Sequence, residues 1–151
     1  MKSIKRRIVT ICSAAFMLLN STCLTANAST NNSYISGFGI QPSIGSWSTL
    51  EYTRQKDTDS SAYLYLTSAQ HPVYVRVMQG STNVTKNGNN DQVTYVTCSQ
   101  GIEYRIKSGA SVPSDITLSF KSSHQYSGFS ITGYWSPDWE NIAGHAYSYA
   151  Y

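Results

Sequence analysis

The stretch Val73-Tyr74-Val75-Arg76-Val77-Met78 decides the fold class, because a valine occupies every second position along it. Successive side chains of an extended strand leave opposite faces of the sheet, so the valines predict one buried face and Arg76 points the other way. The same two-residue period recurs in five further stretches, at 62–67, 93–98, 102–107, 116–121 and 129–134. Residues 49–55 and 146–151 are weaker strand candidates.

Turn-forming residues separate these stretches, among them His71-Pro72, the Asn-rich run 86–91 and Gln100-Gly101. No window has a convincing period of 3.6 residues, which disfavours architectures that alternate strands with helices. We therefore predict an all-β protein, a single antiparallel β-sandwich of six to eight short strands that spans residues 49–151. A small barrel is the alternative. Residues 29–48, rich in Asn, Ser and Gly, are expected to form a flexible leader or one edge strand.

Residues 1–28 have the three parts of a cleavable secretory signal peptide. A basic start is followed by the apolar run 8–19, and Ala26 and Ala28 occupy the −3 and −1 positions of the expected cleavage site. The apolar run is shorter than the ~20 residues that span a bilayer as a helix. We expect the signal helix to be removed and the protein to be secreted, without a membrane anchor. A lipoprotein signal ending at Cys23 is the less favoured alternative.

Removal of the signal changes the charge balance of the chain. The sequence has 11 Lys and Arg against 8 Asp and Glu, and the signal contains four of the basic residues and no acidic one. The remaining seven basic and eight acidic residues give a nearly neutral domain without a Lys/Arg cluster. This composition predicts neither a nucleic-acid partner nor binding to an anionic membrane.

No set of residues predicts catalysis, a cofactor or a metal site. His71, His124 and His145 fall in expected loops or at strand ends, and their spacing is not that of zinc ligands. Cys98 lies in an alternating strand and is expected to be a buried structural thiol, which disfavours a Cys98–His124 nucleophile and base.

The carboxylates also favour structural roles. Asp57 and Asp59 are expected to stabilise a turn rather than to bind calcium. Asp138 and Glu140 flank Trp139 beside a proline-containing turn and are expected to be solvated rather than to act as a glycosidase pair.

Aromatic residues are the unusual feature of the composition, because all 12 tyrosines and all three tryptophans lie outside the signal. A tyrosine ring can stack on a sugar or contact a protein at small entropic cost. The candidate ligand-binding residues are Tyr63, Tyr65, Trp135, Trp139, Tyr147 and Tyr149. The alternative is that these are ordinary strand aromatics, with Trp135 closing the core.

Two stretches of the chain resemble a known group of proteins. Residues 52–63, with Arg54-Gln55-Lys56-Asp57-Thr58-Asp59-Ser60-Ser61, and the later Gly133-Tyr134-Trp135-Ser136-Pro137-Asp138 are similar to segments of small secreted proteins from low-GC Gram-positive bacteria. The resemblance implies an exported β protein and supplies no catalytic residue. It also raises a bacteriocin-like role, although this chain lacks a clear double-glycine leader.

Together these features predict a secreted, non-enzymatic β-sandwich that binds a cell-envelope component, a glycan or another protein. A bacteriocin-like secreted toxin is the first alternative. A secreted hydrolase on a β-sandwich scaffold is the second, because catalytic groups assemble from distant positions in a sequence.

Overall fold

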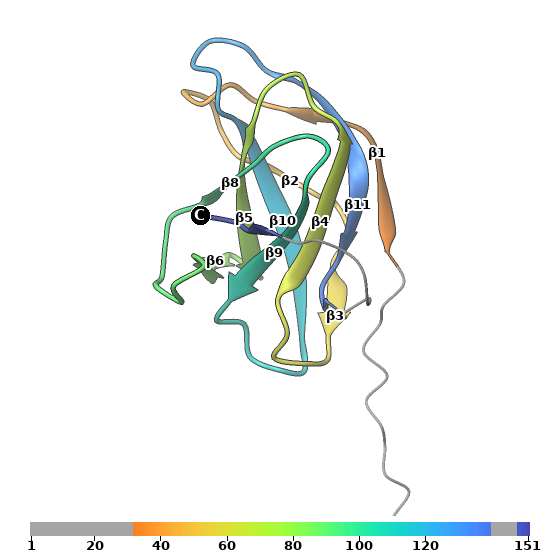
Figure 1. Cartoon of the computed structure of the whole chain (residues 1–151), viewed down its shortest axis with the longest axis vertical. Helices are drawn as coiled ribbons and strands as arrows, with labels where there is room; N and C mark the ends of the chain where they lie inside the picture. Colours follow the sequence, from red (N-terminus) through yellow and green to blue (C-terminus); the bar gives the residue numbers. More distant parts are fainter. Residues whose placement is uncertain (1–31, 140–147) are drawn as a thin grey trace, which may run out of the picture.

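The computed structural model describes residues 32–139 and 148–151, and in these two ranges it contains strands and no helix. Two mainly antiparallel sheets pack face to face, which confirms the predicted all-β sandwich (Figure 1). The strands are β1 (Ser33–Ile40), β2 (Ser48–Thr49), β3 (Arg54–Lys56), β4 (Ala62–Ser68), β5 (Val73–Gln79), β6 (Thr82–Asn83), β7 (Thr85–Lys86), β8 (Val96–Cys98), β9 (Glu103–Ser108), β10 (Ser114–Ser122), β11 (Phe129–Ser136) and β12 (Ser148–Tyr149).

Six strands of six or more residues build the two layers, and the shorter segments extend their edges. The first sheet has the order β1-β11-β4-β9-β12, and β7 also pairs with β9. The second has the order β2-β10-β5-β6, with β3 on β10 and β8 on β5. Every pair of strands is antiparallel except β12 with β9, which is parallel and departs from the predicted antiparallel arrangement.

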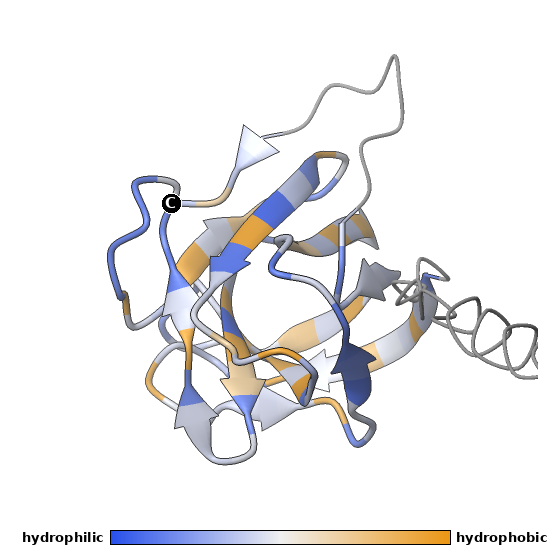
Figure 2. Cartoon of the chain, turned by 90° about the horizontal axis from the view of Figure 1, so that it is seen from below, coloured by the Kyte–Doolittle hydropathy of each residue, from blue (hydrophilic) through white to orange (hydrophobic). Residues whose placement is uncertain are grey.

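The core lies between the sheets and follows from the alternation in the sequence. Val73, Val75 and Val77 of β5 are fully buried, as are Leu64 and Leu66 of β4. Burial of each such side chain stabilises the fold by roughly 1.5–3 kcal/mol. The colour along the strands in Figure 2 alternates between hydrophobic and hydrophilic in keeping with this pattern.

Several boundaries differ from those expected. Residues 29–48 contain β1, an eight-residue edge strand whose Ile35 and Ile40 belong to the same core as the later strands. Within the predicted strand 93–98 only Val96–Cys98 is paired in a strand. The expected signal, with Ala26 and Ala28, lies outside the described residues, and so do Glu140, His145 and Tyr147. The described ranges include no helix with the length and apolarity of a membrane span.

A buried ion pair links the two stretches that carried the resemblance. Lys56, the last residue of β3, places its Nζ 3.1 Å from Oδ1 of Asp138, and both side chains are almost completely buried. The same ammonium donates to the carbonyl oxygens of Ser60 and Pro137. The expectation that Asp138 is solvated is therefore wrong, because the end of β11 carries it under the loop that follows β3.

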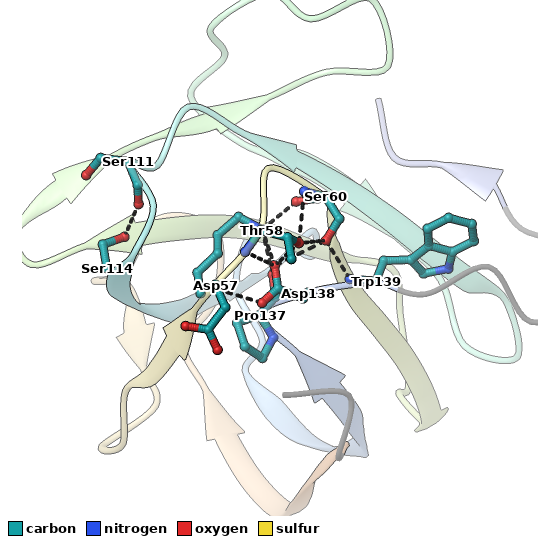
Figure 3. A network of polar contacts seen from close by, with 9 residues as sticks. Asp57, Thr58, Ser60, Ser111, Ser114, Pro137, Asp138 and Trp139 are labelled. Atoms are coloured by element: carbon teal, nitrogen blue, oxygen red, sulfur yellow. Dashed lines mark hydrogen bonds and ion pairs between the residues drawn. The ribbon is translucent and has the colours of Figure 1, made fainter. Parts of the chain in front are cut away.

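The Asp138 carboxylate organises that loop (Figure 3). Oδ2 accepts a hydrogen bond from the backbone N–H of Asp57 at 2.9 Å, and Oδ1 accepts from Oγ1 of Thr58 at 2.7 Å and from Oγ of Ser60 at 3.1 Å. Burial alone acts to raise the pKa of Asp138. The hydrogen bonds from Asp57, Thr58 and Lys56, together with the positive charge of Lys56, outweigh that effect and lower the pKa below its ordinary value.

Candidate functional site

The outer face of the second sheet carries a group of aromatic and basic side chains. Because the valines of β5 point into the core, Tyr74 and Arg76 of the same strand lie on the outer face. The antiparallel register places Lys121 of β10 opposite Tyr74, and Thr97 of β8 lies opposite it on the other side. Lys121 is flanked by the buried Phe120 and Ser122, so its side chain also belongs to the outer face.

Two further rings reach this face from residues that directly precede short strands. Trp47 precedes β2, which pairs with β10, and Tyr95 precedes β8, which pairs with β5. The ring centroids of Tyr74 and Tyr95 are 4.2 Å apart, and those of Trp47 and Tyr95 are 6.3 Å apart. Three rings from separate parts of the sequence therefore meet over the middle of the sheet.

Both basic side chains lie against Trp47. The guanidinium carbon of Arg76 is 3.7 Å from the centroid of the indole, and Nζ of Lys121 is 5.3 Å from the same ring. Nε of Arg76 also donates to the carbonyl oxygen of Thr94 at 2.9 Å. Partial burial lowers the pKa of Arg76, yet a guanidinium stays charged at neutral pH. Stacking and the hydrogen bond together fix the orientation of this cation.

These side chains surround a hollow of about 360 Å³ that is open to solvent. We call it the Trp47 hollow; its walls are Trp47, Tyr74, Arg76, Tyr95 and Lys121, with Ser43 and Thr94 at the rim. Its size lies at the low end of the range of about 300–1,000 Å³ typical of small-molecule sites. The walls contain no carboxylate, histidine or cysteine, so the chemistry they offer is stacking, hydrogen bonding and attraction of negative charge.

Part of the predicted set of ligand-binding residues gathers on the opposite outer face. The guanidinium carbon of Arg105 lies 3.0 Å from the ring centroid of Trp139 and 5.5 Å from that of Tyr149, and its Nη1 donates to the Tyr149 hydroxyl at 3.1 Å. Tyr63 faces Arg105 across the pairing of β4 with β9, and Tyr65 faces Tyr134 across the pairing of β4 with β11. Contacts between the Arg105 guanidinium and the two rings therefore hold Trp139 and Tyr149 together on this face.

Trp135 is not part of either outer face. Its side chain is fully buried, and Nε1 donates to the hydroxyl of Tyr52 at 3.2 Å. A ring enclosed in the core offers no exposed surface to a ligand, so the structure corrects its assignment as a ligand-binding residue. Trp135 instead closes the core, the alternative that the sequence left open.

Of the three histidines and the cysteine considered above, the structure describes His71, His124 and Cys98. The rings of His71 and His124 stack with their centroids 4.8 Å apart, so the fold brings together two loops that the sequence did not connect. Cys98 is completely buried, as predicted, and burial raises the pKa of its thiol. No group of three His, Cys, Asp or Glu side chains in the described ranges is placed to hold a metal ion.

Sequence reasoning missed the Trp47 hollow because its walls come from four separate stretches. Alternation identified the outward position of Arg76, but Trp47 and Tyr95 lie just outside the strands that place them. Both residues directly precede a short strand that pairs with β10 or β5. Predicting their place would have required knowledge of that strand pairing, which cannot be read from one sequence.

Comparison with known proteins adds no relationship to this description. No protein-family model matches the chain, and searches of curated proteins and of solved structures find no significant match. The described part of the molecule is thus defined by its own features: a two-layer β-sandwich with an open aromatic and basic hollow on one outer face.

Proposed function

We propose that the protein is a secreted, non-enzymatic binding module that holds its ligand in the Trp47 hollow. The observation that carries the proposal is the meeting of three aromatic rings and two cations around an open volume of about 360 Å³ on a sheet face. Secretion is supported by the signal pattern in residues 1–28. The ligand is a component of a cell envelope, because an exported chain meets such surfaces first.

The hollow has the rigidity that a binding site requires. Tyr74, Arg76 and Lys121 stand on two long paired strands, and Arg76 is held by the Trp47 ring and by the Thr94 carbonyl. Side chains fixed before binding lose little conformational entropy when a ligand arrives, so more of the contact energy appears as affinity. Mobile surface rings would instead lose conformational entropy on binding, which would offset part of the contact energy.

Calorimetric titration of the purified protein with fractionated envelope glycans tests the proposal. We expect Trp47→Ala and Tyr95→Ala to weaken binding by at least tenfold, about 1.4 kcal/mol. Tyr149→Ala, which removes a ring from the opposite face, is the matched control and should leave affinity within about twofold, or about 0.4 kcal/mol. Loss of binding in the Tyr149 variant with full binding in both hollow variants would overturn the assignment.

A further inference from the structure

The charge of the Trp47 hollow points to the class of its ligand. Arg76 and Lys121 are the charged residues in its walls, and both are positive. Within the described ranges no carboxylate lies within ion-pair distance of either side chain, since the ion pair found there is Lys56–Asp138. The hollow therefore concentrates two positive charges on a domain that is close to neutral as a whole, and it attracts an anion.

Arg76 is arranged to recognise that anion directly. Its Nε is used by Thr94, and its two terminal Nη groups make no hydrogen bond to another described residue. The Trp47 ring holds the guanidinium plane in place. Two Nη donors on a fixed plane match the two oxygens of a carboxylate or a phosphate, and such bidentate pairs are both strong and geometrically specific.

The rest of the hollow favours a sugar over a peptide as the carrier of the anion. Tyr74 and Tyr95 pack against each other and line the hollow with aromatic surface of the kind that packs against the C–H face of a sugar, and Ser43 and Thr94 are also part of its lining. The backbone of β5 beneath them is already paired with β10 on one side and with β8 on the other. A peptide therefore cannot bind here by adding a strand to a free sheet edge.

We propose that the Trp47 hollow binds an acidic saccharide, with Arg76 and Lys121 on its carboxylate or phosphate group and Tyr74 and Tyr95 against its ring. This inference rests on the proposed function and adds the chemical class of the ligand. Uronic acids and sugar phosphates share the required chemistry, and the experiment separates them.

The test is a calorimetric titration of the purified protein with paired oligosaccharides. Oligogalacturonate is compared with its methyl ester, and a phosphorylated glucan with the same glucan after dephosphorylation. We expect at least one acidic probe to bind ten times more tightly than its neutral partner, and we expect the preference to shrink as salt is raised from 0.05 to about 0.5 M. Which acidic probe binds distinguishes a uronate from a phosphate.

Charge variants link the preference to the hollow. Arg76→Gln and Lys121→Gln should each lower the affinity for the acidic probe by about tenfold and the affinity for a neutral probe by less than twofold. The two changes in binding free energy then differ by about 1 kcal/mol. Arg76→Lys keeps the charge but loses the paired donors, and should recover only part of the affinity. Lys86→Gln removes a positive charge from β7, outside the hollow, and should change neither the affinity for the acidic probe nor the affinity for the neutral probe. Near-ultraviolet circular dichroism verifies that the variants are folded.

The possible failures are distinguishable. Equal binding of acidic and neutral probes, abolished by Trp47→Ala, would overturn the acidic ligand class and keep the proposed function. Binding of acidic probes that survives Trp47→Ala, Arg76→Gln and Lys121→Gln would overturn both. Tighter binding of oligoglutamate than of every saccharide would replace the sugar with an acidic peptide.

Discussion

At the scale of single residues, the molecule uses charge in two opposite ways. Lys56 and Asp138 are buried and satisfied by each other and by a loop, so each is needed to compensate the buried charge of the other. Arg76 and Lys121 have no carboxylate partner among the described residues, so their charges remain available to a ligand. The sequence alone does not distinguish the buried charges from the available ones, because that difference depends on where the four side chains lie in the fold.

Asp138→Ala should destabilise the protein by about 3–5 kcal/mol, because it leaves the Lys56 ammonium buried without its counter-charge and removes the acceptor for the loop of residues 57–60. Chemical denaturation with urea measures the change. Asp115→Ala, which truncates an exposed aspartate of β10, is the control and should cost less than about 0.5 kcal/mol. A loss below 1 kcal/mol for Asp138→Ala would contradict the structural role of the pair.

The lowered pKa of Asp138 gives the fold a defined acid sensitivity. In the unfolded chain the carboxyl takes up a proton near its ordinary pKa of about 3.9, whereas the folded carboxyl does so only at lower pH. The contribution of Asp138 is therefore complete above about pH 5 and is lost as the pH falls through the folded pKa. Urea midpoints measured from pH 6 to 2 should fall more steeply for the natural protein than for Asp138→Asn. Parallel curves would show that another group controls acid unfolding.

Cys98 should resist thiol reagents in the folded state, because its side chain is fully buried and burial raises the pKa of the thiol. Labelling with Ellman's reagent is expected to be slow in buffer and complete in 6 M guanidinium. The labelling rate should follow the rate of unfolding. Rapid stoichiometric labelling of native protein at pH 7 would mean that the β5–β8 side of the core opens easily.

At the scale of elements, five of the six long strands were predictable from alternation, whereas β1 and the bounds of the short strands were not. Alternation over six or more residues identified β4, β5, β9, β10 and β11, because a half-buried strand imposes a period of two. Segments of two or three residues contain too few positions to show a period, and their pairing depends on distant partners. The same limit explains why the parallel pairing of β12 with β9 was not anticipated.

The C-terminal segment joins the edges of the two sheets. The backbone N–H of Ala150 donates to Arg105 of β9 at 3.1 Å, and that of Thr97 in β8 donates to the carbonyl oxygen of Tyr151 at 2.8 Å. The Tyr151 ring lies against Gly88, where an added Cβ would come within 2.6 Å of ring atoms. A side chain at position 88 would therefore have to displace the exposed Tyr151 ring.

Gly88→Ala should move the exposed Tyr151 ring aside, since the new methyl group occupies the space of that ring, while the backbone hydrogen bonds keep the tail in place. Hydrogen exchange at the amides of Ala150 and Thr97 is expected to change by less than about twofold, or about 0.4 kcal/mol of protection. Gly39→Ala provides the comparison, because a Cβ there meets no atom within 4 Å. Exchange at least tenfold faster at both amides in Gly88→Ala alone would show that the Tyr151 ring, and not the backbone pairing, holds the tail.

At the scale of the whole molecule, the two sheets present two aromatic outer faces with different consequences. The first gathers Trp139 and Tyr149 around Arg105, with Tyr63 opposite Arg105 in the pairing of β4 with β9. The second forms the open Trp47 hollow, which depends on the register of β2 with β10 and of β8 with β5. Side-chain type predicted aromatic surface residues, whereas the meeting of Trp47, Tyr74 and Tyr95 around one hollow depends on sheet register.

The binding of an acidic saccharide in the Trp47 hollow can be tested by chemical-shift mapping of isotopically labelled protein titrated with the acidic oligosaccharides. We expect saturable shifts at Trp47, Tyr74, Arg76, Tyr95 and Lys121, with the indole N–H of Trp47 among the largest. Resonances around Arg105 and Tyr149 should stay within experimental error. Shifts confined to the opposite face, or binding of the ligand without any shift at the hollow residues, would contradict the assignment of the Trp47 hollow as the binding site.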